Sequence, residues 1–293
     1  MKRIIPHSAF YTIVAMVLIS SVVAMLYACR PDSQARHTLV VSIQPQRFLL
    51  EKIAGEHYDV VSLLQEGANP EQYEPSMNNV MALEQCDAYF MVGHIGFEAA
   101  ILNRVMANRP DLKVCDTSVG INLINIPHGT TTGDPHVWAS IRNARIIAQN
   151  MLAALIKLDS RHEQYYRRRC LALLKQLDEL DSSISMQLDS CGNKAFVVWH
   201  PALSYFARDY GLTQIYIEDA KGMVTQQRLK QVVDEAKSRH AKVFFYQKGF
   251  DKRVIETANS EIGSQLIEIT PLAYAWDVEM LKMSQAIRNN NSR

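Results

Sequence analysis

The chain has 293 residues, with 31 lysines and arginines against 30 aspartates and glutamates, so its formal net charge is +1 at pH 7. This balance, without a long basic or acidic run, argues against a nucleic-acid-binding protein, because such proteins carry clustered positive charge. The length suffices for one large domain or for two lobes with cores of their own.

The first 29 residues have the pattern of a secretion signal. Lys2 and Arg3 precede an apolar block, AFYTIVAMVLISSVVAML, that contains no charged residue. Such a segment is typical of a signal peptide and does not belong to the fold. The block is also about long enough to cross a bilayer, so an uncleaved helical anchor is the alternative. The segment LYAC resembles a bacterial lipobox, so we expect cleavage before Cys29, a lipid on its thiol, and an extracytoplasmic, membrane-anchored protein.

The first half of the body alternates short apolar, β-branched runs with helical patterns. Strands are predicted at 38–43, 58–64, 87–93 and 113–118, and helices at 45–56, 78–86 and 97–109. This alternation predicts βαβ units and a parallel sheet. A further helix is expected from near Ile141, and we assign residues 38–160 to an N-terminal α/β lobe.

A long segment without glycine or proline, residues 161–190, follows this lobe. Its apolar residues recur at helical spacing. They are Cys170, Leu173, Leu174, Leu177, Leu180, Ile184 and Leu188. At about 1.5 Å per residue such a helix would span roughly 40 Å, the width of a domain. We therefore expect a rigid helix that joins two lobes and limits how far they swing, unlike a flexible linker.

The second half repeats the alternation of strands and helices. Strands are predicted at 195–200, 212–217, 241–247 and 265–270, and helices at 203–211, 226–240, 252–263 and 277–287. Pro201 stands at a position suited to a helix start. We assign residues 191–293 to a C-terminal α/β lobe, so the predicted fold is α/β, with two parallel-sheet lobes joined by one long helix.

Four cysteines follow Cys29 at wide spacing, namely Cys86, Cys115, Cys170 and Cys191. An oxidising compartment permits disulfides, but four cysteines allow three pairings that the sequence does not distinguish. Since the chain contains no C-x-x-C motif, we expect buried free thiols.

Three residues with metal-binding side chains follow predicted strands. Glu71 lies in the loop after the second strand, His136 lies in GDPHVW after the fourth, and His200 ends the first strand of the second half. Ligands of open parallel sheets bind beyond the carboxyl ends of the strands, so these residues should converge from both lobes. Two imidazoles and a carboxylate suit zinc. The competing interpretation is that the histidines are packing residues, and that the nearby Glu74 is a helix-capping or first-turn acid.

Three segments carry a family resemblance: GANPEQYEPSMNNVMALEQCDAYFMVGHIGFE, GDPHVWAS, and WHPALSYFARDYGL with IEDAKGMVTQQRL. They resemble the metal-binding proteins of bacterial zinc and manganese uptake ABC transporters, and the match covers, in order, nearly the whole chain after the signal. The resemblance implies two α/β lobes joined by one long helix, a metal ion in the cleft between them, and His136 and His200 as ligands. It also implies delivery of the ion to an ABC permease driven by a cytoplasmic ATPase. Because this chain has no G-x-x-x-x-G-K-[ST] motif, it is not the ATPase itself.

The chain departs from the family's ligand pattern at two positions. Where the family usually has a histidine, this chain has Glu71, which we predict as the third ligand, with Gln72 as a poorer substitute. Where many members have an aspartate, this chain has Thr270. The fourth ligand is therefore open among a water, Asp277, Gln247 and Thr270. The histidine-rich loop that zinc-transport members often carry before DPH is also missing, which removes one marker for zinc without excluding it.

We predict a monomeric, lipid-anchored receptor that binds a divalent metal outside the cytoplasmic membrane, with zinc favoured by its imidazole ligands. A glutamate ligand shifts the site towards harder ions, so manganese or iron is the alternative. A zinc hydrolase is a more distant alternative, since two histidines and a glutamate with an open position form its ligand set too. We expect that the protein is not an enzyme, because the chain lacks an H-E-x-x-H motif. An adhesin-like surface lipoprotein with a structural metal is the last alternative.

Overall fold

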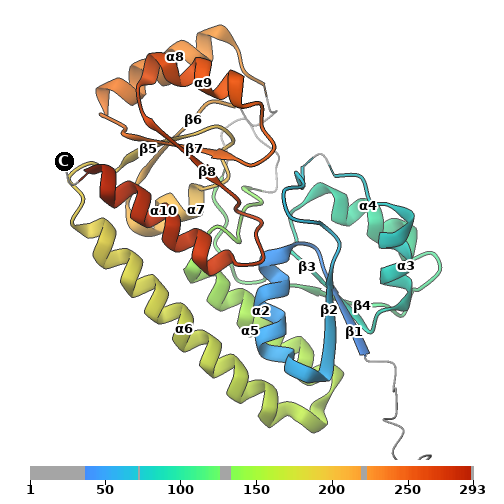
Figure 1. Cartoon of the computed structure of the whole chain (residues 1–293). Coiled ribbons are helices and arrows are strands. Elements are labelled where there is room, and N and C mark those ends of the chain that lie inside the picture. The colour runs from blue at the N-terminus through green and yellow to red at the C-terminus, as the bar shows by residue number, and fades with distance from the viewer. Residues whose placement is uncertain (1–36, 72, 126–132, 219–222, 292–293) are drawn as a thin grey trace, which may run out of the picture. The chain divides into compact units, whose positions relative to one another are not determined.

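Two four-stranded parallel sheets organise the chain (Figure 1). This computed structural model describes residues 37–71, 73–125, 133–218 and 223–291. The first sheet has the order β2-β1-β3-β4, and its strands are β1 (His37–Val41), β2 (Tyr58–Ser62), β3 (Ala88–Met91) and β4 (Lys113–Asp116). The second has the order β6-β5-β7-β8, with β5 (Ala195–Val198), β6 (Thr213–Tyr216), β7 (Val243–Gln247) and β8 (Gln265–Ile269). The predicted fold of two parallel-sheet α/β lobes is therefore confirmed.

Helices connect the strands in each lobe. In the N-terminal lobe they are α2 (Gln44–Ala54), α3 (Met77–Gln85), α4 (Gly96–Val105) and α5 (Ile141–Leu158), with short 3-10 turns at Gly55–His57 and Ser160–His162. After α6 (Glu163–Asp189) come α7 (Ser204–Tyr210), α8 (Gln226–Ser238), α9 (Lys252–Ile262) and α10 (Trp276–Asn291). Among the described residues, none of these helices has both the length and the apolar character needed to cross a membrane.

Pro201 does not start a helix, contrary to the interpretation from sequence. It lies in a turn in which the Ala202 N–H donates to the His200 carbonyl at 2.7 Å, and α7 begins three residues later at Ser204. The Leu203 N–H donates to Gln214 Oε1 at 2.8 Å, so a side chain from β6 satisfies a donor at the start of α7. His200 thus lies on irregular backbone, two residues after the end of β5.

The long helix expected between the lobes is α6, and it packs along its length against other helices. Its buried residues follow one face at helical spacing. They are Tyr166, Cys170, Leu173, Leu177, Ile184 and Leu188. This face contacts α5 and α2 of the N-terminal lobe and α10 and α7 of the C-terminal lobe, and Figure 1 shows α6 running beside α5 and α10. The helix is therefore part of the core of both lobes rather than an isolated rod.

One apolar core extends through both lobes. It includes the fully buried Leu39 and Val40 of β1 and continues into Phe196 of β5 and Trp276 of α10. A second, smaller cluster lies against the C-terminal sheet and includes Val197 and Phe244. Successive residues of β5 thus enter different clusters, because side chains alternate between the two faces of a strand. A continuous core favours small movements between the lobes, since large ones would expose apolar surface.

The four cysteines among the described residues are free thiols, as expected. Cys86, Cys170 and Cys191 are buried, whereas Cys115 at the edge strand β4 is partly exposed. Burial raises the pKa of the Cys86 thiol to about 11, so this thiol stays protonated at neutral pH. Cys29, where a lipid was predicted, lies outside the described residues.

Candidate metal centre

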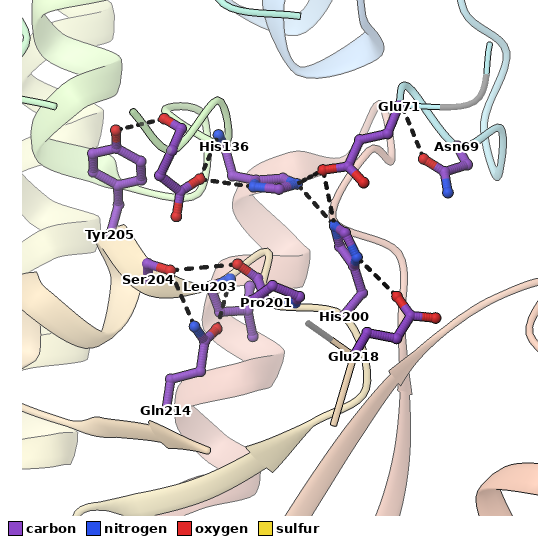
Figure 2. Close-up of polar contacts among 11 residues, drawn as sticks. Asn69, Glu71, His136, His200, Pro201, Leu203, Ser204, Tyr205, Gln214 and Glu218 are labelled. Carbon is purple, nitrogen blue, oxygen red and sulfur yellow. Dashed lines mark hydrogen bonds and ion pairs between the residues drawn. The ribbon is translucent and has the colours of Figure 1, made fainter. Parts of the chain in front are cut away.

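Glu71, His136 and His200 lie together at the boundary of the two lobes (Figure 2). His200 Nε2 is 3.2 Å from His136 Nε2 and 3.4 Å from Glu71 Oε1. His136 Nε2 is 3.8 Å from the same glutamate oxygen. Among the described histidines, cysteines, aspartates and glutamates, these form the one group of three or more whose ligand atoms lie within 4.8 Å of one another.

The spacing of these three atoms fits one face of a coordination tetrahedron. Ligand atoms that are about 2.0 to 2.2 Å from a tetrahedral ion lie about 3.3 to 3.6 Å from each other. The three separations here, 3.2, 3.4 and 3.8 Å, bracket that range. A single ion can therefore reach all three atoms after shifts of a few tenths of an ångström, and its fourth position faces away from them.

A tight turn in GDPHVW holds His136. The carboxylate of Asp134 accepts the backbone N–H of His136 at 2.9 Å and its ring Nδ1–H at 2.8 Å. Asp134 is 1 % exposed and His136 is 3 % exposed, so both bonds are shielded from water. Burial alone would raise the pKa of the Asp134 carboxyl, but the hydrogen bonds and charge of His136 outweigh it and lower that pKa. Asp134 is thus ionised and fixes the direction of the ring.

A second carboxylate holds His200. Glu218, which follows β6, lies with Oε2 3.0 Å from His200 Nδ1, and its other oxygen accepts the indole N–H of Trp199 at 2.6 Å. A carboxylate has only lone pairs to offer, so each histidine must place its hydrogen on Nδ1. The lone pairs of both Nε2 atoms then point at each other and at Glu71.

This arrangement brings three acceptors together with no donor between them, so it requires a cation or a proton. Burial lowers the pKa of His200, but hydrogen bonds to Glu218 and Glu71 and their charges outweigh it and raise that pKa to about 9. Burial raises the pKa of Glu71, and the hydrogen bond and charge of His200 reverse this and lower it. A divalent cation would replace that proton and satisfy all three acceptors at once.

Residues of the C-terminal lobe hold the turn that contains His136. Tyr205 of α7 donates its hydroxyl to the Asp134 carbonyl at 2.7 Å, and the Trp276 indole N–H donates to the Trp138 carbonyl at 2.9 Å. The Trp138 ring lies 5.1 Å from the His136 ring and is 3 % exposed. This apolar ring therefore shields one side of the site from water.

The backbone conformation directly before Asp134 requires a glycine at position 133. Its φ is +80°, and a Cβ there would lie 3.1 Å from Leu123 Cβ and 3.2 Å from the Ile124 carbonyl oxygen. Gly133→Ala should lower the free energy of unfolding by more than the about 1 to 2 kcal/mol that this conformation costs an L-residue. Gly67→Ala is the matched control, because Gly67 has φ +81° and a Cβ added there would meet no atom within 4 Å. Urea unfolding measures the free energy of unfolding of both variants. Equal decreases in the two would mean that Leu123 and Ile124 move aside without cost.

The candidates for the fourth ligand lie as follows. Asp277 is in the first turn of α10, where its Oδ1 accepts the Val278 N–H at 3.0 Å, and it lines a small cavity of about 150 Å³ beside α6. It is not in the group that contains Glu71. Gln247 is the last residue of β7, and Thr270 follows β8. The choice among a water, Asp277, Gln247 and Thr270 stays a prediction. Gln72, the poorer substitute for Glu71, lies outside the described residues.

Two other residues with potential ligand atoms, Glu74 and His94, lie outside the group that contains Glu71. Glu74 is exposed, and α3 begins after the N-cap Ser76 with no acidic residue in its first turn, so Glu74 is neither the cap nor a first-turn acid of that helix. His94 Nε2 lies 3.1 Å from Ser118 Oγ in the N-terminal lobe.

Asp134 and Glu218 were not among the residues predicted from the sequence. For Asp134 a local signal existed, because an aspartate two residues before a histidine can accept that histidine's backbone N–H. For Glu218 no local signal existed. It is 18 residues from His200 along the chain, and the two meet because β5 and β6 pair in parallel and end at the same edge of the sheet.

Comparisons with known proteins identify relatives of this chain by sequence and by fold. Residues 39–283 match the family model described as zinc-uptake complex component A, periplasmic. A putative metal-binding protein of Chlamydia trachomatis serovar D is 34% identical over 194 residues, which are 64% of this chain and 67% of that protein. The iron ABC transporter substrate-binding lipoprotein MtsA of Streptococcus pyogenes serotype M1 is 25% identical over 227 residues, 73% of each chain.

A solved structure supports the same relationship. The crystal structure of a ZnuA deletion mutant with zinc bound has a TM-score of 0.82 and 32% sequence identity, and the match covers 88% of this chain and 98% of that one. The resemblance is thus confirmed by sequence and by fold. Because the family model spans most of the chain, this protein belongs to the family of periplasmic A components of zinc-uptake complexes.

Proposed function

We propose that this protein captures a divalent metal ion, zinc before others, through Glu71, His136 and His200, and delivers it to an ABC permease for import. The observation that carries the proposal is the convergence of two Nε2 lone pairs and one carboxylate oxygen, with separations of 3.2 to 3.8 Å. The carboxylates behind both histidines support it, because such partners orient metal-ligating rings and raise their basicity. Membership of a zinc-uptake family supports the transport role.

Zinc is preferred because imidazole ligands and the general order of divalent affinities favour it over manganese and iron. The zinc-bound structural relative points the same way. The alternative within the same class is manganese or iron, since Glu71 supplies a hard oxygen ligand and the relative MtsA is named as an iron transporter component. The ion is cargo, so the site needs reversible binding rather than a permanent structural metal.

We propose that the protein is a binding protein rather than a zinc hydrolase. A hydrolase needs a carboxylate or histidine free to activate the metal-bound water. The two carboxylates behind the ligands, Asp134 and Glu218, are each committed to a histidine Nδ1. Neither is therefore placed to accept a proton from water at the ion.

The remaining parts of the proposal concern location and partners. We propose a monomer that lies outside the cytoplasmic membrane, is anchored by a lipid on Cys29, and works with a permease and its cytoplasmic ATPase. The lipobox-like LYAC and the lipoprotein relative MtsA support the anchor. A Cys29→Ala precursor that is processed and lipid-labelled like the parent would contradict it. The permease must favour a state in which ligands of one lobe are displaced, since a partner acts only through differential affinity.

Asp134→Asn should weaken zinc binding by about 10- to 100-fold, the usual loss when a group that orients a ligating histidine is changed. The amide can still accept the backbone N–H, but it lacks the negative charge that interacts with the His136 ring and fixes its direction. Asp87→Asn is the control, because Asp87 pairs with His37 at the start of β1. Zinc affinity would be measured by chelator competition. An unchanged affinity in Asp134→Asn would show that the ring needs no carboxylate.

The test of the proposed function is a titration of metal-stripped protein, residues 37–293, with zinc and with manganese under chelator competition. We expect one-to-one zinc binding that is much tighter than manganese binding, and a metal-free form that is folded by circular dichroism. Tighter manganese binding would identify the alternative metal. Unfolding on metal removal would instead indicate a structural ion and favour the adhesin-like alternative. Failure to bind either ion tightly would contradict the metal-receptor function.

A further inference from the structure

Glu71 differs from the two histidines in how it is held. Its side chain is 40 % exposed, whereas those of His136 and His200 are 4 % and 9 % exposed. The hydrogen bond of its backbone is local, because its N–H donates to Asn69 Oδ1 at 2.9 Å within the same loop. The place of its carboxylate therefore depends on how the loop between β2 and α3 is fastened to the rest of the lobe.

Tyr73 fastens this loop two residues after Glu71. Its hydroxyl oxygen lies 2.7 Å from Asn79 Oδ1 and 3.1 Å from the Leu63 carbonyl oxygen. Its ring packs edge-on against Phe97 of α4, with ring centroids 5.2 Å apart. The polar end and the ring of Tyr73 are thus held by different elements of the N-terminal lobe.

Asn79 ties the same hydroxyl to both sides of the loop. Its Oδ1 accepts the Ser76 N–H at 2.8 Å, which completes the cap of α3, and its Nδ2–H donates to the Leu63 carbonyl at 3.2 Å. Leu63 directly follows β2, so the end of that strand and the start of α3 meet at Tyr73. We call the side chains of Tyr73 and Asn79, with the Leu63 carbonyl, the loop clamp.

The other end of the loop is fastened to the C-terminal lobe. Glu66 Oε1 accepts the backbone N–H of Tyr274, in the turn after β8, at 2.7 Å. Along the loop, Glu71 therefore lies between Glu66, which is bonded to the C-terminal lobe, and the loop clamp in the N-terminal lobe. If the loop clamp opens, Glu71 can move away from the histidines while the buried core stays intact.

We propose that Tyr73 is a positioning residue for the metal ligand Glu71, and that its hydroxyl controls how long the bound ion stays in the site. This inference rests on the proposed function, in which Glu71 ligates the ion. Figure 2 shows the Glu71 carboxylate reaching across to both histidines from its loop. The loop clamp maintains that reach, so loss of the hydroxyl should let the ligand leave more often and speed dissociation of the ion.

The test is Tyr73→Phe in the purified full chain, with zinc as the probe and stopped-flow transfer of zinc to a chelator as the readout. Phenylalanine keeps the ring contact with Phe97 and removes only the hydroxyl. We expect the zinc dissociation rate to rise by about tenfold, at the lower end of the usual effect of changing a group behind a ligand. The association rate should stay within about twofold, because encounter with the buried histidines is unchanged.

Tyr166→Phe is the matched control. Tyr166 is in the first turn of α6, and its hydroxyl donates to Asp159 Oδ2 at 2.8 Å. Asp159 does not belong to the group that contains Glu71. Tyr166→Phe should therefore leave the zinc dissociation rate unchanged. The metal-free melting temperatures of the two variants should be similar, so that a difference in dissociation rate reports on the site and not on global stability.

A double-mutant cycle separates positioning from general packing. In a Glu71→Ala background, Tyr73→Phe should change the dissociation rate by less than about twofold, because coupled residues do not act additively. An unchanged rate in Tyr73→Phe alone, or the same tenfold effect with and without Glu71, would overturn the inference. A failure of the proposed ligand set looks different. In that case Glu71→Ala itself would leave zinc affinity at the parent value.

Discussion

Replacement of His136 or His200 by alanine should lower zinc affinity by at least about 100-fold, because each change removes a ligand atom. Changing only a group that orients a ligand usually lowers metal affinity by about 10- to 100-fold. Each alanine replacement also removes the ring that Asp134 or Glu218 holds through Nδ1. The measurement is a competition titration of the metal-stripped variants with zinc.

His162→Ala is the control for the histidine variants. The His162 ring stacks on His57 with centroids 4.1 Å apart, and its Nδ1 lies 2.6 Å from Asp159 Oδ2, so it is a structured histidine outside the group that contains Glu71. Its removal should leave zinc affinity within about twofold of the parent, as expected for a site without shared partners. If His136→Ala or His200→Ala retains the parent affinity while folded, the metal does not bind at this centre.

Zinc affinity should rise by about tenfold for each pH unit between about pH 6 and pH 8.5, because the ion must displace the proton on His200. Glu218 and Glu71 outweigh burial and raise the pKa of that histidine to about 9, so the metal-free protein carries the proton throughout this range. An imidazole with an ordinary pKa near 6.5 would stop competing with the metal above about pH 7. The persistence of the slope above pH 7 is therefore the distinguishing result.

The same shift has the opposite sign for the stability of the metal-free protein. A folded-state pKa above the unfolded value adds stability that is fully present below about pH 6.5 and is lost as the pH rises towards 9.

Glu218→Gln should lower the pKa of His200, because it removes the carboxylate that contributes most to raising that pKa. The rise of zinc affinity with pH should then end at a lower pH. Zinc titrations at several pH values, corrected for protonation of the chelator, measure this. A flat profile above pH 7 in the parent would contradict the raised pKa.

The fold was predictable from local patterns because each half of the chain alternates apolar strand segments with segments of helical periodicity. Runs such as AFVVWH are apolar on both faces, as expected of strands covered on both sides, and β5 is buried at every position. The long segment 161–190 has one apolar stripe and no helix breaker, and it forms α6. The error at Pro201 arose because a proline is equally suited to a turn, and the Ala202–His200 hydrogen bond closes that turn before α7 begins.

The candidate site was only partly predictable. The rule that ligands gather at the carboxyl ends of parallel strands picked out Glu71, His136 and His200. The resemblance implied His136 and His200 as ligands, and Glu71 stood where the family usually has a histidine. The carboxylate of Glu218, which orients the His200 ring, did not follow from any local pattern. The clamp formed by Tyr73 and Asn79 did not either, because a hydroxyl and an amide six residues apart in a loop have many alternative partners.

The sequence by itself determined the order of strands and helices, the division of the chain into two sheets, and the residue types available for a metal. Hydrophobic periodicity and helix-breaking residues act over a few neighbouring residues, so secondary structure can be predicted from them without knowledge of the fold. Only the tertiary structure decided that Glu71 and the two Nε2 atoms meet within 3.8 Å, and that Glu218 raises the pKa of a histidine 18 residues away. Those properties depend on distance and burial between segments from two lobes, and the packing of the shared core around α6 sets both.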